Sequence, residues 1–128
     1  MSSIFENIIY TFDYIDRPIL FVTRIGRELY LNLLIKEEGR IEEWLQTSIN
    51  WEDFDLLKDS QKSFYSVFIE HITNLKIIII SDEDEIEVCP LEQKYKIVSV
   101  DAILPSPEIF SENLATIDNP DIQNEVLR

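Results

Sequence analysis

The chain has 128 residues, of which 45% are hydrophobic, and its 25 Asp and Glu against 11 Lys and Arg give a formal net charge of −14. This length suits one domain, and an aromatic content of 11% argues against intrinsic disorder. So negative a charge argues against direct binding to DNA, RNA or anionic membranes, because these interactions rest on cationic side chains.

The first half of the chain predicts a three-stranded antiparallel meander. Residues 19–23 form the first predicted strand, after Pro18, and residues 28–35 and 41–49 form the next two. The two glycines, Gly26 and Gly39, fall between these strands, where hairpin turns are expected. Alternation places on one face of the second strand Leu29, Leu31, Leu33 and Ile35, and on one face of the third Ile41, Leu45 and Ile49.

Two helices are predicted next. Asn50 is a candidate N-cap, and Asp53 at the third helical position places a negative charge near the positive end of the helix dipole. The buried stripe of this helix is predicted to hold Trp51, Phe54 and Leu57, and that of the second helix Phe64, Val67, Phe68, His71 and Ile72. Trp44 and Trp51 flank the entry to the first helix, where core packing is favoured over a role as interface anchors.

Strands are predicted again beyond residue 75. Residues 76–80 are so apolar that a strand covered on both faces is expected. Residues 81–85 are expected to form a solvated loop, residues 86–89 a short strand before Pro90, and residues 95–102 the last strand, which Pro105 ends.

The end of the chain carries two helix-start signals. Ser106-Pro107-Glu108 precedes Phe110 and Leu114, and Asn119-Pro120-Asp121 precedes Ile122 and Val126. They predict either two small docking helices or a tail that orders on a partner. The fold class is therefore α+β, an antiparallel meander packed by two central helices, with a single domain over residues 1–104 and a tail of short helices over residues 105–128.

Residue types needed for chemistry are scarce. His71 is the single histidine, and no motif places a nucleophile beside it, so a structural role is favoured over that of a general base. Cys89 is the single cysteine, which excludes an intramolecular disulfide and a zinc site built from cysteines and favours an inert buried thiol. Two glycines are too few for a phosphate-binding loop or a dinucleotide fingerprint. We therefore predict no catalytic residue, no metal ligand and no cofactor.

The acidic excess is concentrated in the second half of the chain. Residues 65–128 hold 13 acidic and 4 basic side chains, against 12 and 7 in residues 1–64. The densest run consists of Asp82, Glu83, Asp84, Glu85 and Glu87. An EF-hand loop needs an oxygen ligand where Ile86 stands and a glycine where Glu87 stands, so the run is interpreted as a surface for a basic partner. The predicted partner-binding residues are this run together with Phe110 and Leu114.

The stretch from Pro18 to Phe68 resembles a family of small, uncharacterised bacterial proteins. The resemblance rests on Pro18-Ile-Leu-Phe21, Gly26, Leu29-Tyr30-Leu31, Trp44-Leu45, Ser48, Phe54, Leu57, Ser63-Phe64 and Val67-Phe68. It covers about fifty of the 128 residues, implies a fold of meander plus helices and a bacterial or phage origin, and transfers no active site. Where that family often has proline in the region of the third strand, this chain has Ser48-Ile49, and the acidic run is its own.

Three functions are open to such a chain. The leading one is a non-catalytic interaction module, an accessory, adaptor or immunity-type subunit that presents an acidic surface to a larger protein with a basic face. The second is a DNA mimic that occupies the basic groove of a nuclease or another DNA-binding protein. The third is an enzyme with a carboxylate–metal site around residues 82–87. The chain shows no leader, and its longest apolar run, Ile77–Ile80, is too short to span a bilayer, so a cytoplasmic protein is predicted, for which self-association is a further option.

Overall fold

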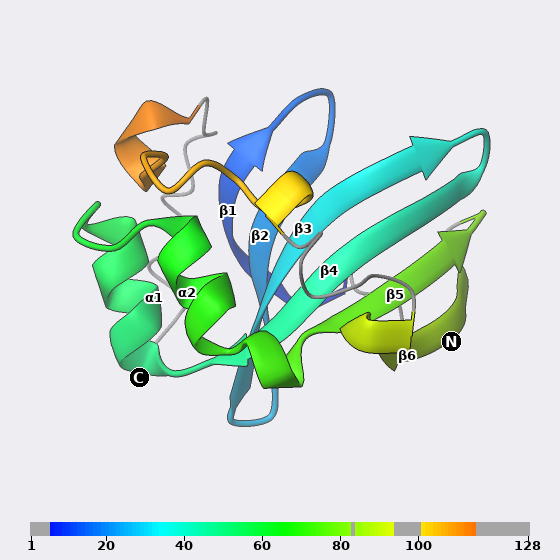
Figure 1. Cartoon of the computed structure of the whole chain (residues 1–128), viewed down its shortest axis with the longest axis horizontal. Coiled ribbons are helices and arrows are strands. Elements are labelled where there is room, and N and C mark those ends of the chain that lie inside the picture. Colours follow the sequence, from blue (N-terminus) through cyan, green and yellow to red (C-terminus); the bar gives the residue numbers. More distant parts are fainter. Residues whose placement is uncertain (1–5, 83, 94–100, 115–128) are drawn as a thin grey trace.

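The computed structural model describes residues 6–82, 84–93 and 101–114. Six strands form one antiparallel sheet in chain order, with two helices on one of its faces (Figure 1). The strands are β1 (Ile8–Tyr14), β2 (Pro18–Ile25), β3 (Glu28–Glu38), β4 (Ile41–Ile49), β5 (Lys76–Ser81) and β6 (Asp84–Pro90). The α+β class, with a meander sheet packed by helices, is confirmed.

Both glycines occupy the turns that the sequence predicts. Gly26 and Gly39 each have a φ of +63°, a left-handed conformation that glycine adopts without a Cβ clash. The last pair before the first turn is Ile25 with Glu28, and the last pair before the second turn is Glu38 with Ile41, so each turn has two residues. These turns fix the register of β2, β3 and β4, and with it the face on which each side chain lies.

The helices begin where predicted. Helix α1 (Trp51–Lys58) follows Asn50, whose Oδ1 accepts a hydrogen bond from the Asp53 backbone N–H at 2.7 Å. The Asp53 carboxylate accepts from the Asn50 backbone N–H in return, which completes a capping box. Helix α2 (Phe64–Glu70) is shorter than its apolar spacing predicts. His71 ends it, and Ile72 starts the 3-10 turn η1 (Ile72–Asn74).

Hydrophobic side chains lie on both faces of the sheet. The main core, between the sheet and the helices, includes Phe12, Leu31, Leu45, Phe54, Phe64, Phe68 and Ile77. A smaller cluster on the opposite face consists of Phe21, Trp44, Ile78 and Ile80. Strand β5 therefore contributes to both clusters, as its unbroken apolar run predicts. Trp44 is fully buried and Trp51 packs against the main core, so the core interpretation of both tryptophans is confirmed.

The strands differ from the predicted ones at three places. Strand β1 was not predicted, because Thr11 and Asp13 interrupt its apolar pattern, and its ladder with β2 contains three register shifts. The loop expected at 81–85 is a tight turn instead, since Asp84 already pairs with Ser81 in the β5–β6 ladder. Ile41 was predicted to share a face with Leu45 and Ile49, which are buried, but it is 48% exposed at the start of β4.

The described part of the C-terminal segment packs on the domain. Leu104 belongs to the main core, and Ile109 and Leu114 pack against it. The α-helix expected after Ser106 is not formed, and one 3-10 turn, η4 (Ser111–Asn113), stands there. The Ser106 hydroxyl accepts from the Glu108 backbone N–H at 3.3 Å, a local bond that competes with helical pairing.

Parts of three further predictions fall outside the described residues. The strand expected over residues 95–102 lies there up to residue 100, and Asp101 and Ala102 form a 3-10 turn, not a strand. The second C-terminal helix, after residue 119, and Glu83 of the acidic run also lie outside them. Among the described residues, no helix has the length and apolarity needed to cross a bilayer.

The capping box of α1 gives a direct test of the fold. Replacing Asn50 by Ala removes the acceptor of the Asp53 N–H bond, so we expect the free energy of unfolding to fall by about 1 kcal/mol. N50D keeps the acceptor, so its free energy of unfolding should fall by clearly less. Urea unfolding of the three proteins measures the difference, and equal losses in both variants would contradict the capping role.

Candidate functional site

Two hairpin turns bring acidic residues together at one end of the sheet. The ladder pairs Ile41 with Ser81 and Glu42 with Ile80, so the tips of the β3–β4 and β5–β6 hairpins are neighbours (Figure 1). The residues around them are Glu37, Glu38, Glu42, Glu43, Asp82, Asp84, Glu85 and Glu87. We call residues 37–43, 82 and 84–87 together the acidic hairpin end.

Arg17 holds the β3–β4 part of this end together. Glu37 and Glu42 stand directly opposite each other in the ladder, where two like charges repel. The Arg17 guanidinium lies between them: Nη1 pairs with the Glu42 carboxylate, and Nη2 lies 3.4 Å from Glu37 Oε2. Nη2 makes no hydrogen bond among the described residues, so its contact with Glu37 is purely ionic. The same guanidinium lies 5.8 Å from the centre of the Trp44 ring, and Trp44 Nε1 donates to Glu42 Oε1 at 2.9 Å.

Two more cations form ion pairs with carboxylates of the acidic hairpin end. Lys36 Nζ lies 3.5 Å from Glu38 Oε2 and 4.0 Å from Glu43 Oε2. Arg40 Nη1 lies 3.5 Å from Asp82 Oδ1, which links the tips of the two hairpins. Carboxylates still outnumber these cations, and the side chains of Glu38 and Asp82 are 78% and 61% exposed. The surface left for a partner is therefore anionic.

The predicted partner-binding residues separate into two groups. Asp82 lies in the β5–β6 turn with a φ of +54°, Asp84 and Glu85 begin β6, and Glu87 is exposed in the same strand. Phe110 and Leu114 flank η4, and this segment lies at the opposite end of the molecule (Figure 1); Leu114 packs against the main core. Sequence reasoning missed Glu37–Glu43, because only the register of paired strands brings this stretch beside residue 82.

His71, at the end of α2, contacts Asp53 in the first turn of α1. Its Nε2 lies 3.1 Å from Asp53 Oδ2, while Lys62 Nζ lies 3.2 Å from Asp53 Oδ1 and 2.7 Å from Glu70 Oε2. Burial alone would raise the pKa of Asp53, but the hydrogen bonds from His71, Lys62 and the Asn50 N–H hold it below its ordinary value. Burial likewise opposes the rise of the Lys62 pKa, which the bonds to Glu70 and Asp53 cause.

This cluster resembles a catalytic dyad only in composition. In the described part of the chain, Asp53 is the sole side-chain partner of His71, and no hydroxyl or thiol hydrogen bonds to the ring. Asp53 also closes the capping box of α1. Cys89 is buried in the main core. The arrangement joins the first turn of α1 to the end of α2, and it lacks a nucleophile.

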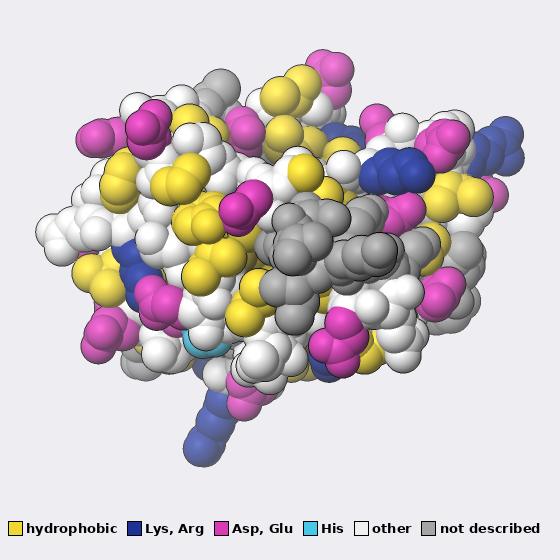
Figure 2. Space-filling model, in the orientation of Figure 1, with side chains coloured by type: hydrophobic (Ala, Val, Ile, Leu, Met, Phe, Trp, Pro, Cys, Tyr) yellow, Lys and Arg dark blue, Asp and Glu magenta, His cyan; other side chains and the backbone are white. Residues whose placement is uncertain are grey.

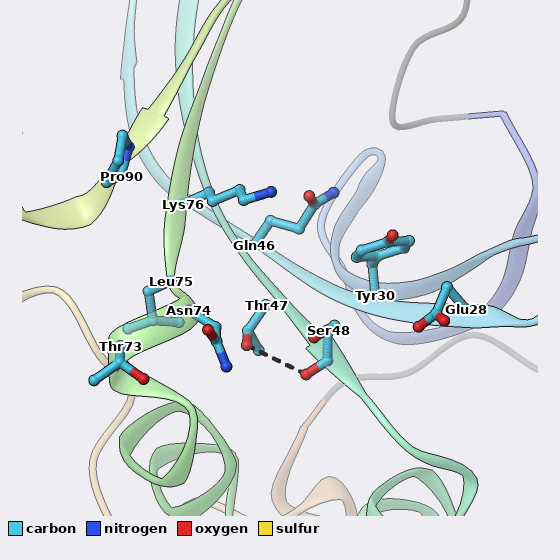
Figure 3. Close-up of a pocket in the computed structure, with 10 residues that line it drawn as sticks. All are labelled: Glu28, Tyr30, Gln46, Thr47, Ser48, Thr73, Asn74, Leu75, Lys76 and Pro90. Carbon is cyan, nitrogen blue, oxygen red and sulfur yellow. Dashed lines mark hydrogen bonds between the residues drawn. The ribbon is translucent and has the colours of Figure 1, made fainter.

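A polar cavity of about 330 Å³ opens at the other end of β3 and β4 (Figure 3). Strand β5 starts at Lys76, opposite Gln46, so Thr47 and Ser48 continue β4 without a β5 neighbour. The chain before Lys76 turns away through η1, and the cavity fills the gap between η1 and β4. Its lining includes Glu28, Tyr30, Gln46, Ser48, Asn74 and Lys76.

The described residues contain no group of three or more His, Cys, Asp and Glu side chains that could hold a metal ion. Comparisons of the chain with family models, with curated proteins and with solved structures give no match. The resemblance of residues 18–68 to a bacterial family therefore stays a prediction.

The role of Asp53 predicts how stability depends on pH. Because its pKa is lowered in the folded state, its carboxylate stabilises the fold fully above the ordinary value of 3.8, and this contribution is lost as the pH falls through the folded value. D53N should lower the free energy of unfolding at pH 7 by about 1 to 3 kcal/mol and flatten its decline below pH 3.8. Urea unfolding as a function of pH tests this, with E52Q, a change of a neighbouring exposed carboxylate, as control.

The Arg17 clamp predicts non-additive effects. R17Q should lower the free energy of unfolding by about 1 to 2 kcal/mol, because Glu37 and Glu42 are then opposed without a cation. E37Q should change the wild type little and restore part of the loss in R17Q, since it removes the repulsion. A double-mutant cycle measured by urea unfolding decides the matter, and strictly additive losses would contradict the clamp.

Proposed function

We propose that this chain is a cytoplasmic, non-catalytic interaction module that binds a larger protein with a basic surface. Its role is that of an accessory, adaptor or immunity-type subunit in a bacterial or phage system. The acidic hairpin end is the binding surface. The observation that carries the proposal is the joining of two acidic stretches, 37–43 and 82–87, by the pairing of Ile41 with Ser81.

The ion pairs that the lysine and arginine side chains form within the chain support this proposal. Five of the described Lys and Arg residues contact carboxylates of the chain itself: Arg17, Lys36, Arg40, Lys58 and Lys62. These ion pairs lie within the chain, so few unpaired positive charges are left that would repel a basic partner. A field of this sign raises the rate at which a cationic surface is encountered. The exposed side chain of Ile41, between the carboxylates, adds an apolar contact of the kind that interfaces bury at their centre.

An alternative explanation is protection of the sheet edge. Strand β6 is last in the sheet, and charges on an edge strand discourage unwanted pairing with another chain. The two explanations differ in their consequences. Edge protection concerns self-association alone, whereas an interaction surface affects a different protein.

DNA mimicry is the other alternative, and it requires carboxylates at phosphate-like spacing along one face. Figure 2 shows Asp and Glu side chains scattered over the visible face, above helices and strands alike. A scattered pattern does not supply the phosphate-like rows of carboxylates that imitation of a duplex requires.

The proposal is tested with two variants of equal net charge. E38Q/D82N/E87Q neutralises exposed carboxylates of the acidic hairpin end, and E6Q/E108Q/E112Q neutralises three exposed carboxylates elsewhere. A partner captured from the native host and then purified should bind the first variant about tenfold more weakly than wild type and the second about as tightly as wild type. Fluorescence titration at two salt concentrations measures the affinities.

Each other outcome has a defined meaning. Equal weakening in both variants would show that only the net charge matters, and capture of no basic partner at low salt would contradict the proposal. Displacement of DNA from the captured protein would favour the mimic. Self-association of the first variant in gel filtration, with unchanged partner binding, would identify the carboxylates as edge protection.

A further inference from the structure

The gap in the sheet beside the end of β4 carries an inference independent of the proposed function. Strand β5 starts at Lys76, opposite Gln46, so β4 has a strand neighbour only on its β3 side from Thr47 to Ile49. The polar cavity of about 330 Å³ lies where a longer β5 would run. Its volume falls at the small end of the range for ligand sites. The acidic hairpin end lies at the opposite end of β4.

Ser48 directs its backbone N–H and C=O into this gap. In an antiparallel sheet, successive residues direct these groups to opposite neighbours. The Arg24 N–H donates to the Asn7 C=O at 3.1 Å, so the backbone of Arg24 faces β1. Its ladder partner Leu29 therefore faces β4, and Ile49, opposite Leu29, faces β3. Ser48 precedes Ile49 and faces the other way, into the gap.

These backbone groups are available to a ligand. No hydrogen bond joins the Ser48 N–H to another described residue. The Ser48 C=O accepts from the Thr47 hydroxyl at 3.3 Å (Figure 3), and a carbonyl oxygen has a second lone pair for another donor. An unpaired strand edge is a template for an added strand. The chemistry of the gap therefore matches an extended polypeptide.

Lys76 favours one direction for that polypeptide. A chain antiparallel to β4 runs in the same direction as β5 and reaches Lys76 with its carboxyl end, where β5 blocks its further course. Lys76 is exposed, lines the cavity and has no ion-pair partner among the described residues, whereas Lys36, Lys58 and Lys62 all contact carboxylates. Its ammonium group attracts a terminal carboxylate and repels the terminal ammonium that a parallel chain would bring.

From this juxtaposition we propose that the gap binds the carboxyl-terminal end of a partner polypeptide, extended and antiparallel to β4. The last residue pairs with Ser48: its carboxylate accepts from the Ser48 N–H and contacts the Lys76 ammonium, and its own N–H donates to the Ser48 C=O. Glu28 lies across the lining from Lys76 (Figure 3), on the side where the bound chain leaves. A cationic residue upstream of the carboxylate is therefore favoured, as it also is by the net charge of −14.

The test is a titration of the isotope-labelled full-length chain, followed by NMR, with acetylated pentapeptides composed of Lys, Thr and Val that have free carboxyl ends. We expect saturable shifts at residues 46–48 and 74–76. The amidated forms should bind about tenfold more weakly, because they lack the terminal charge. Acetate should not reproduce the shifts at the same concentration, and acetate binding as tight as peptide binding would overturn the added strand.

Hydrogen exchange of the Ser48 amide tests the backbone geometry directly. In the free protein this amide should exchange with solvent faster than those of Thr47 and Ile49, which face β3. Saturation with the best peptide should slow it about tenfold. A Ser48 amide as protected in the free protein as its two neighbours, or unchanged by the peptide, would contradict the proposed pairing.

Two variants assign the charges. K76Q should bind the free acid and the amide about equally, and E28Q should lose the preference for peptides with an upstream Lys over those with Gln in its place. R27Q, a change of an exposed cation outside the lining, should behave as wild type. No saturable shift with any of the peptides at about 10 mM, or an unchanged preference for the free acid in K76Q, would overturn the proposal. E38Q/D82N/E87Q should bind the peptides as wild type does, so this site and the acidic hairpin end are tested separately.

Discussion

The register between β3 and β4 is the constraint on which the rest of the molecule depends. The turn at Gly39 pairs Glu38 with Ile41, and the ladder then continues to Leu29 paired with Ile49. A slip of β4 by one residue against β3 would exchange the two faces of β4. Leu45 would then leave the main core, and Trp44 would leave the opposite cluster. The same register places Glu37 against Glu42 at one end of the strands and Tyr30 against Ser48 at the other, so the acidic hairpin end and the polar cavity both follow from it.

Cations and carboxylates have different roles in this protein. The cations act mainly inside the structure: Arg17 separates Glu37 from Glu42, Arg40 joins two hairpin tips, and Lys62 joins two helices through Asp53 and Glu70. Exposed ion pairs contribute little stability individually, but a cation placed between two facing carboxylates also removes a repulsion. The remaining carboxylates are left to set the field outside the molecule. An acidic protein can therefore remain folded and still attract a basic partner when its few cations lie between carboxylates that would otherwise repel each other.

Local signals predicted much of the fold, and non-local contacts account for what was missed. The cap at Asn50, the turns at Gly26 and Gly39 and the two-sided strand at Ile77–Ile80 depend on residues close in sequence, and each is found as predicted. Residues 81–85 were expected to form a solvated loop, but Asp84 and Glu85 already pair with β5, because an edge strand such as β6 tolerates charges. The helix signal at Ser106 yields to the packing of Ile109 and Leu114 on the core. The candidate site was half predicted: residues 82–87 were identified from composition, whereas their union with 37–43 depends on a ladder between distant segments.

The acidic hairpin end and the polar cavity lie at opposite ends of β4, which limits how a change at one can affect the other. Glu42 and Gln46 are four residues apart on one strand, or roughly 13 Å at the usual rise of a β-strand. Any coupling between them requires an element with two arrangements that both sites bias. Strand β4 is a poor element of this kind, because it is paired on both sides from Ile41 to Gln46 and its buried side chains contribute to both hydrophobic clusters. The segment 71–75 is a better one, because η1 is a single turn with no buried residue, and it connects the His71–Asp53 contact to the cavity wall at Asn74. The cavity is therefore joined more directly to the two helices, through η1, than to the acidic hairpin end, through the doubly paired strand β4.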